Sequence, residues 1–130
     1  MTREQQRATR AHSHISNICA LPDGVKTKYG TLCMKAPIML KTMGLLQMLE
    51  FICSRDEPAA MKFLGHLASD VHDAKLIGDE NEGSLRTKAR GADLLEYMRL
   101  THELDATLVW YRRFAQSMLK ASTTDEAGGP

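Results

Sequence analysis

The chain has 130 residues, of which 25% are charged and 5% aromatic, and its formal net charge is +1. This length suits one domain with a hydrophobic core, and many Met, Leu and Ala beside few β-branched residues favour helices. The longest apolar run, 37–53, is interrupted by Lys41, Gln47 and Glu50, which makes it too polar to span a membrane.

The three cysteines are odd in number and show no C-x-x-C spacing. Cys19, Cys33 and Cys53 each lie on an apolar stripe, which favours buried free thiols over disulfides or metal ligands. With no signal peptide ahead of them, the sequence predicts a soluble, cytoplasmic protein.

Charge is distributed unevenly although the net charge is small. Residues 1–50 contain seven Lys or Arg against three Asp or Glu, whereas residues 51–130 contain ten against thirteen. The N-terminal part is therefore where an anionic partner is expected.

The first predicted helix runs from Thr2 to about Ala20. Apolar residues spaced three and four apart predict one buried stripe, consisting of Ala8, Ala11, Ile15 and Ile18. A neighbouring stripe consists of Arg3, Arg7, Arg10 and His14. The turn residues 21–24 end this helix.

The next two predicted helices meet at Pro37. The second runs from about Val25 to Ala36, because proline disfavours helical geometry at the residue before it. The third runs from Pro37 to about Ser54 and is apolar nearly all round. One side is expected in the core. The other side, with Leu40, Met43, Met48 and Phe51, is expected either to be covered within the chain or to contact another subunit, and these four residues are the candidates for that contact.

The second half of the chain predicts further helices and no strands. A fourth helix begins at Pro58, and the acidic segment 78–83 is expected to be a mobile loop. Residues 84–98 predict one or two short helices, and Thr101 is expected to cap a last helix that ends near Ala121. The prediction is thus an all-α, single compact domain of five or six helices over 1–121, followed by a disordered tail, 122–130.

Signals for catalysis or metal binding are absent from the sequence. It contains no P-loop, no G-x-G-x-x-G and no nucleophile elbow. The His12-x-His14 pair and the 70–73 segment lack a further ligand set, so a solvated acidic face is expected at Asp70 and Asp73. We therefore expect no cofactor, no metal and no enzymatic activity.

Three sets of basic residues are candidates for binding phosphate, which requires cations on a shared surface without cancelling carboxylates. The Arg3, Arg7 and Arg10 stripe is equally consistent with an ordinary solvated face. The remaining candidates for RNA binding are Lys26, Lys28, Lys35, Lys41, Arg112 and Arg113. No aromatic platform for stacking bases is evident, so readout of base sequence is not expected.

Trp110 is predicted to lie at the polar edge of the last helix. Its indole is expected either to pack within the chain, with Arg113 as a cation–π partner, or to contact a neighbouring subunit. Both alternatives stay open at this point.

An ordered set of residues resembles the small-subunit family of the type III-B CRISPR RAMP (Cmr) effector. The set consists of Tyr29-Gly30, Leu32, Lys35, Pro37, Gly44-Leu45, Phe51, Tyr97, Leu100-Thr101, Glu103-Leu104, Trp110 and Arg113-Phe114-Ala115. The nearest confusion is the small subunit of type III-A effectors, but the elements 29–37 and 110–115 favour III-B.

This resemblance implies a structural, RNA-facing subunit. Its partners would be RAMP backbone subunits and other Cmr subunits, copies of itself in a filament, and the CRISPR RNA with its target RNA. The main alternative is a helical protein–protein adaptor that does not bind nucleic acid. A DNA-binding regulator is less favoured, because 37–54 is too apolar for a recognition helix.

Overall fold

The described part of the chain, residues 1–121, contains six helices and no strand. In this computed structural model the helices are α1 (Arg3–Cys19), α2 (Asp23–Met43), α3 (Leu45–Ser54), α4 (Pro58–Asp73), α5 (Glu82–Gly91) and α6 (Leu94–Met118). The predicted all-α class is confirmed. The predicted disordered tail, 122–130, lies outside the described residues.

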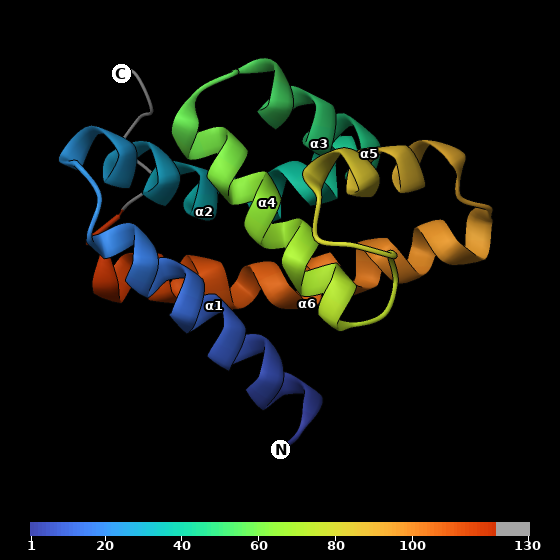
Figure 1. Ribbon diagram of the computed structural model, residues 1–130, viewed down its shortest axis with the longest axis horizontal. Coiled ribbons are helices and arrows are strands. Elements are labelled where there is room, and N and C mark those ends of the chain that lie inside the picture. The colour runs from blue at the N-terminus through green and yellow to red at the C-terminus, as the bar shows by residue number, and fades with distance from the viewer. Residues whose placement is uncertain (122–130) are drawn as a thin grey trace.

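The longest helix, α6, is the element on which α1 and α2 pack. α4 packs across α2, and α3 and α5 pack beside α4. Figure 1 shows α6 along one side of the molecule, with α1 crossing it obliquely and α4 running diagonally over the middle. The core lies between these layers.

Three aromatic rings from three helices form the centre of the core. Phe63 of α4 contacts Tyr29 of α2 and Tyr111 of α6 edge to face, at centroid distances of 5.5 and 5.8 Å. The predicted stripe on α1 packs into the same core through Ala11, Ile15 and Ile18, while Ala8 is half-buried. Edge-to-face contacts and close packing of this kind stabilise a unique arrangement of helices.

The predicted helix boundary at Pro37 is wrong, because α2 continues through Pro37 to Met43. Proline costs one backbone hydrogen bond within a helix. Here Ala36 and Leu40 are both buried, at 0% and 4% exposed, so packing on either side of Pro37 holds the backbone helical. Tertiary contacts therefore outweigh the local preference.

The break between α2 and α3 lies instead at Gly44, whose φ is +83°. A residue without a Cβ adopts this conformation at little cost. The amide of Leu46 lies in the first turn of α3, where helical partners are missing, and it donates to Tyr97 Oη at 3.0 Å. The turn is thus fixed to α6 by one hydrogen bond.

The predicted start of the last helix at Thr101 is also wrong. Asp93 caps α6, its side chain accepting from the Glu96 amide at 2.8 Å, with the Glu96 side chain bonded back to the Asp93 amide. Thr101 lies inside the helix and donates to the Tyr97 carbonyl. The segment predicted as short pieces contains α5, capped by Asn81, and the first turns of α6.

Candidate nucleic-acid interface

The four lysines predicted to bind RNA all lie on α2, but they differ in their contacts. Lys26 Nζ lies 3.3 Å from Asp23 Oδ1, and Lys28 Nζ lies 2.9 Å from Glu57 Oε2. Lys35 and Lys41 are exposed and make no ion pair within residues 1–121. Only these two of the four lysines therefore present an uncompensated charge.

The pairing of Lys28 was not visible in the sequence, because Glu57 lies beyond α3. Hydrogen bonds from Lys28 and Arg55 lower the pKa of Glu57, so this carboxylate stays ionised. A cation with such a partner attracts phosphate less strongly than a free one.

The two arginines of the prediction lie near the end of α6. Arg112 is half-buried, and its Nη1 donates to the Met34 carbonyl of α2 at 2.9 Å. A carbonyl does not cancel the charge of the guanidinium. Arg113 is exposed and makes no ion pair in the described range.

The helices α2 and α6 run antiparallel, side by side. Gly30 lies against Leu119, Met34 is bonded to Arg112, and Gly44 lies near Tyr97. The cations Lys35, Lys41, Arg112 and Arg113 therefore lie on two adjacent helices, and we call this surface the α2–α6 face. On α2, Lys35, Ile38 and Lys41 share about a third of the helix circumference.

The residues predicted to contact another subunit fall into two groups. Leu40 and Met48 are buried in this chain's own core, at 4% and 0% exposed, so they offer no accessible surface. Met43 is half-buried, and Phe51 is 44% exposed. The apolar surplus of this segment is thus taken up mainly by α4, α5 and α6, which the sequence could not place around it.

For Trp110, the structure shows packing within the chain. Its ring stacks on Phe114 at a centroid distance of 5.9 Å, and its Nε1 donates to Glu4 Oε2 at 3.2 Å. The ring partner is therefore Phe114 rather than Arg113. The indole is half-buried against the core.

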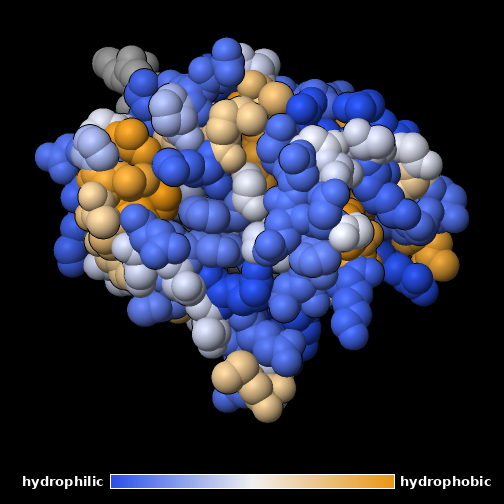
Figure 2. Space-filling model, viewed as in Figure 1, coloured by the Kyte–Doolittle hydropathy of each residue, from blue (hydrophilic) through white to orange (hydrophobic). Residues whose placement is uncertain are grey.

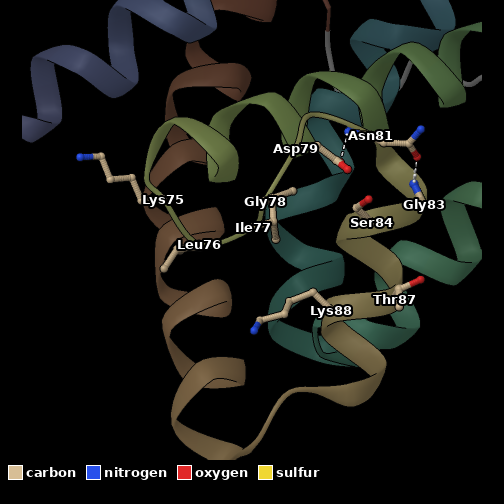
Figure 3. Close-up of a pocket in the computed structure, with 10 residues that line it drawn as sticks. All are labelled: Lys75, Leu76, Ile77, Gly78, Asp79, Asn81, Gly83, Ser84, Thr87 and Lys88. Carbon is tan, nitrogen blue, oxygen red and sulfur yellow. Dashed lines mark hydrogen bonds between the residues drawn. The ribbon is translucent and has the colours of Figure 1, made fainter.

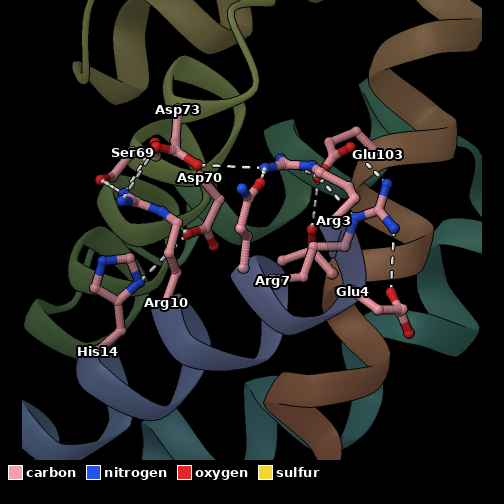
Figure 4. Close-up of polar contacts among 11 residues, drawn as sticks. Arg3, Glu4, Arg7, Arg10, His14, Ser69, Asp70, Asp73 and Glu103 are labelled. Carbon is pink, nitrogen blue, oxygen red and sulfur yellow. Dashed lines mark hydrogen bonds and ion pairs between the residues drawn. The ribbon is translucent and has the colours of Figure 1, made fainter. Parts of the chain in front are cut away.

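The arginine stripe of α1 is engaged in ion pairs that join α1 to α4 and α6 (Figure 4). Arg3 Nη2 and Arg7 Nη2 lie 2.7 and 2.9 Å from the two carboxylate oxygens of Glu103. Arg10 Nε lies 3.1 Å from Asp70 Oδ1. These contacts favour a structural role for the stripe over phosphate binding.

Burial tends to raise the pKa of Glu103, but the hydrogen bonds and charges of Arg7 and Arg3 outweigh it and lower the pKa below its usual value. The carboxylate is therefore stabilised in its charged form by both arginines.

The predicted solvated acidic face on α4 is wrong for Asp70, which is only 3% exposed. Tyr111 Oη donates to Asp70 Oδ2 at 2.5 Å and lies 2.7 Å from His14 Nδ1. Because the hydroxyl's one proton goes to Asp70, His14 Nδ1 must carry hydrogen and donate to Tyr111. His66 stacks on His14 at 4.2 Å and its Nδ1 is 2.6 Å from Tyr29 Oη.

This polar cluster has shifted pKa values. Burial raises the pKa of Asp70 to about 6, against hydrogen bonds from Tyr111 and Arg10. Burial, with the charge of Arg10, lowers the pKa of His14 to about 4. Burial, with His14 and Lys62, lowers the pKa of His66 to about 3. The two imidazoles are therefore neutral at neutral pH, and the cluster joins α1, α2, α4 and α6.

A cavity of about 860 Å³ lies between the α4–α5 loop and α5 and contains none of the predicted residues (Figure 3). Its polar groups are used by the loop itself, since Asp79 accepts from the Asn81 amide and Asn81 accepts from the Gly83 amide. Lys88 is paired with Glu96, and Lys75 points away from the other lining residues. Ser84 and Thr87 are hydrogen-bonded to Asp79 and Arg90. Among the described residues, the polar side chains that line this cavity therefore contact one another or their neighbours, or point away from it, and do not form a ligand site.

Within residues 1–121, no three His, Cys, Asp or Glu side chains are grouped so that they could hold a metal ion. Over the same range, every helix is too short or too polar to cross a membrane.

Comparison with known proteins is in agreement with the sequence resemblance. The family model for a CRISPR-associated protein (Cas_Cmr5) matches residues 3–118. The CRISPR system Cmr subunit Cmr5 of Thermus thermophilus is 33% identical over 119 residues, covering 92% of this chain and 97% of that protein. The crystal structure of a CRISPR-associated Cmr5 family protein from Thermus thermophilus superimposes with a TM-score of 0.78 at 31% identity, covering 91% of this chain and 98% of that one. The chain therefore belongs to the CRISPR-associated Cmr5 family, the small-subunit family of the type III-B Cmr effector.

Proposed function

We propose that this chain is a non-catalytic structural subunit of a type III-B Cmr complex. It stacks with copies of itself beside the RAMP backbone subunits and contacts the backbone of the CRISPR RNA or target RNA without sequence specificity. Family membership supports a place in the complex, since the Thermus thermophilus relative is a Cmr subunit by name.

The observation that carries the RNA contact is the α2–α6 face. Lys35, Lys41 and Arg113 are exposed there without ion pairs among the described residues, whereas the arginines of α1 are paired with Asp70, Asp73 and Glu103. Uncompensated cations on one surface attract phosphates by a field that does not depend on base sequence. The face thus suits backbone contact.

Two features support a role without base readout or catalysis. Three aromatic rings, Tyr29, Phe63 and Tyr111, are fully buried and so cannot stack on bases. Phe51, the one exposed Phe, Tyr or Trp among the described residues, does not form a stacking platform by itself. The acid–base groups that the fold brings together, such as Asp70 and His14, are bonded to neighbouring helices and serve packing.

The test is the salt dependence of RNA binding by the isolated protein. Each lost contact between a cation and single-stranded RNA reduces the slope of log K against log salt by about 0.7. The double variant Lys35→Glu/Lys41→Glu should therefore lower that slope by about 1.4, for any RNA sequence, in fluorescence anisotropy titrations. Lys62→Glu, an exposed lysine of α4, is the control and should leave the slope unchanged.

The alternative is an adaptor that binds proteins only. It is favoured by the pairing of Lys26 and Lys28 with carboxylates and by exposed apolar side chains such as Ile38 on the same helix. No measurable affinity of the wild type for RNA would favour this adaptor, and affinity that is flat from low to moderate salt and equal in the double variant would count against RNA contact by Lys35 and Lys41.

A further inference from the structure

The most exposed large apolar side chains within the described range, apart from Met1, gather at the start of α6. Leu94 is 76% exposed, and Leu95 and Met98 are each 57% exposed. Positions four apart on a helix are neighbours, so Leu94 and Met98 form a continuous strip with Leu95 beside it. Figure 2 shows small apolar patches on a mostly hydrophilic face, one of them at the end of the molecule where α6 begins.

This strip forms a ridge between two grooves. Leu94 lines a groove of about 630 Å³ together with Leu40 and Tyr97. Leu95 lines a second groove, of about 570 Å³, together with Leu76. Met98 and His102 line both grooves. Another helix can pack on such a surface, because its side chains fit into the two apolar grooves on either side of the ridge.

The charges around the ridge define the partner. The two grooves are lined by four cationic residues, Arg3, Arg7, Lys41 and Arg99, and by two acidic residues, Glu103 and Asp105. Glu103 is already shared by Arg3 and Arg7. Lys41 lies in one groove and Arg99 in the other, and neither makes an ion pair with a described residue. Asp105 shares the groove of Lys41 and offsets its charge, so only the side of Arg99 presents a net positive charge. The complement is a helix with an apolar stripe and carboxylates on the flank that faces Arg99.

A second copy of this chain does not supply that complement from its described helices. Ile38 is flanked by Lys35 and Lys41, and Val109 is followed by Arg112 and Arg113. Phe51 adjoins Glu50, whose carboxylate is bonded to Arg86 and Arg90. Each of these exposed apolar sites would bring cations, or an occupied carboxylate, to the ridge.

We infer that the ridge Leu94–Leu95–Met98 is a docking surface for an amphipathic helix, acidic on the flank that faces Arg99, that belongs to a different protein subunit. This inference rests on the proposed function, because the Cmr complex is what supplies a neighbouring subunit. It assigns a contact next to the α2–α6 face: Lys41 lies at the edge of both surfaces, whereas Lys35 and Arg113 belong to the RNA-facing surface alone.

The test is assembly of the complex from its purified subunits and guide RNA, with the copies of this chain in each particle counted by native mass spectrometry. Two variants change the docking surface, and we call them the ridge variants. The double variant Leu95→Ser/Met98→Ser removes apolar side chains of the ridge, and Arg99→Glu reverses the charge in the adjoining groove. Val109→Ser, 45% exposed near the other end of α6, is the matched apolar control, and Lys62→Glu is the charge control. Circular dichroism establishes that each variant is folded before assembly.

For both ridge variants, we expect the average number of copies retained per particle to be at least about tenfold lower than for wild type. For both controls, we expect the wild-type number of copies. Wild type and all variants assembling alike would overturn the docking surface and leave the proposed function standing. Failure of the wild-type chain to join any particle would instead overturn the proposed function, and the docking inference with it.

Two further results would also overturn the inference by identifying another occupant. Ridge variants that assemble normally but bind target RNA more weakly would assign the ridge to RNA. Self-association of the isolated wild-type chain in sedimentation experiments, lost in the ridge variants, would assign it to a second copy.

Discussion

His14 and His66 lie with their rings stacked, in surroundings that disfavour a charge on either. Their pKa values are lowered to about 4 and about 3, so the unfolded chain binds two protons at pH 5 that the folded chain does not. Asp70 acts in the opposite direction, because its pKa is raised to about 6 and the folded chain binds a proton there before the unfolded chain does. Counting these three groups, the unfolded state therefore binds one net proton more between about pH 4 and 6.

This balance predicts that stability falls as pH is lowered. One net proton corresponds to a loss of about 1.4 kcal/mol in the free energy of unfolding per pH unit, from about pH 6 down to about 4. Replacing one imidazole, as in His66→Gln, makes the number of protons bound by these groups equal in the folded and unfolded chains. The free energy of unfolding should then depend less on pH over this range. Urea unfolding at several pH values measures both chains, and equal slopes would contradict the assignment.

Glu103 accepts hydrogen bonds from Arg3 and Arg7 while only 7% exposed. Glu103→Gln removes the charge and leaves two guanidinium groups repelling each other, so we expect the free energy of unfolding to fall by about 2 kcal/mol. Glu4→Gln is the control, because the Glu4 side chain is 57% exposed and surface pairs contribute about 0–1 kcal/mol. The free energies of unfolding are measured by chemical denaturation. Similar losses in both variants would show that Glu103 contributes no more to stability than an exposed glutamate.

At the scale of the helices, the turn between α2 and α3 depends on one residue. A Cβ at Gly44 would meet only Tyr97 Oη, at 3.8 Å, so the cost of a substitution comes from its φ of +83° and not from a clash. The backbone of Gly44, with φ +83° and ψ 168°, is in a region that is essentially restricted to glycine, so Gly44→Ala should destabilise the chain by about 1–3 kcal/mol. Gly65→Ala, inside α4 with nothing within 4 Å of the added Cβ, should stabilise it by about 0.5–1 kcal/mol. In thermal unfolding, a lower melting temperature for Gly44→Ala and a higher one for Gly65→Ala would confirm this prediction. Shifts of the melting temperature in the same direction would contradict it.

The helices themselves could be predicted because apolar residues recur with helical spacing, as in Ala11, Ile15 and Ile18. Their boundaries could be predicted only where local chemistry decides them, as at Pro58 in the first turn of α4. Pro37 predicts a boundary that the structure does not have, because the burial of Ala36 and Leu40 on the same helix offsets the cost of the proline. The start of α6 is decided by Asp93 rather than by Thr101, because Asp93 and Glu96 together form a capping box.

At the scale of the whole molecule, α1 closes the core. It buries Ala11, Ile15 and Ile18 and supplies Arg7 and Arg10 as partners to buried carboxylates. A chain without residues 1–20 would expose that apolar surface and leave Asp70 and Glu103 without cations. We expect it to lack a cooperative thermal transition and a dispersed NMR spectrum, and a synthetic α1 peptide to restore both. A cooperative transition in the shortened chain alone would contradict this role.

The candidate interface was only partly predictable for the same reason. Sequence identifies cations, but it does not reveal that Glu57 lies against Lys28 or that Glu103 lies between Arg3 and Arg7. These pairs are separated by 29 to 100 residues along the chain. Lys35 and Lys41 were predicted on the same basis as the others, and only the fold separates them.

The packing of α1 and α2 on α6 also has a consequence for biosynthesis. Arg3 and Arg7 are translated about a hundred codons before Glu103, the residue that they pair with. Because chains leave the ribosome in order, at about 5–20 residues per second, α1 and α2 emerge several seconds before the helix that covers them. During that interval their apolar faces are open to chaperones or to other nascent chains. Completion of the fold is therefore tied to the release of α6 from the ribosome rather than to the synthesis of the first helices.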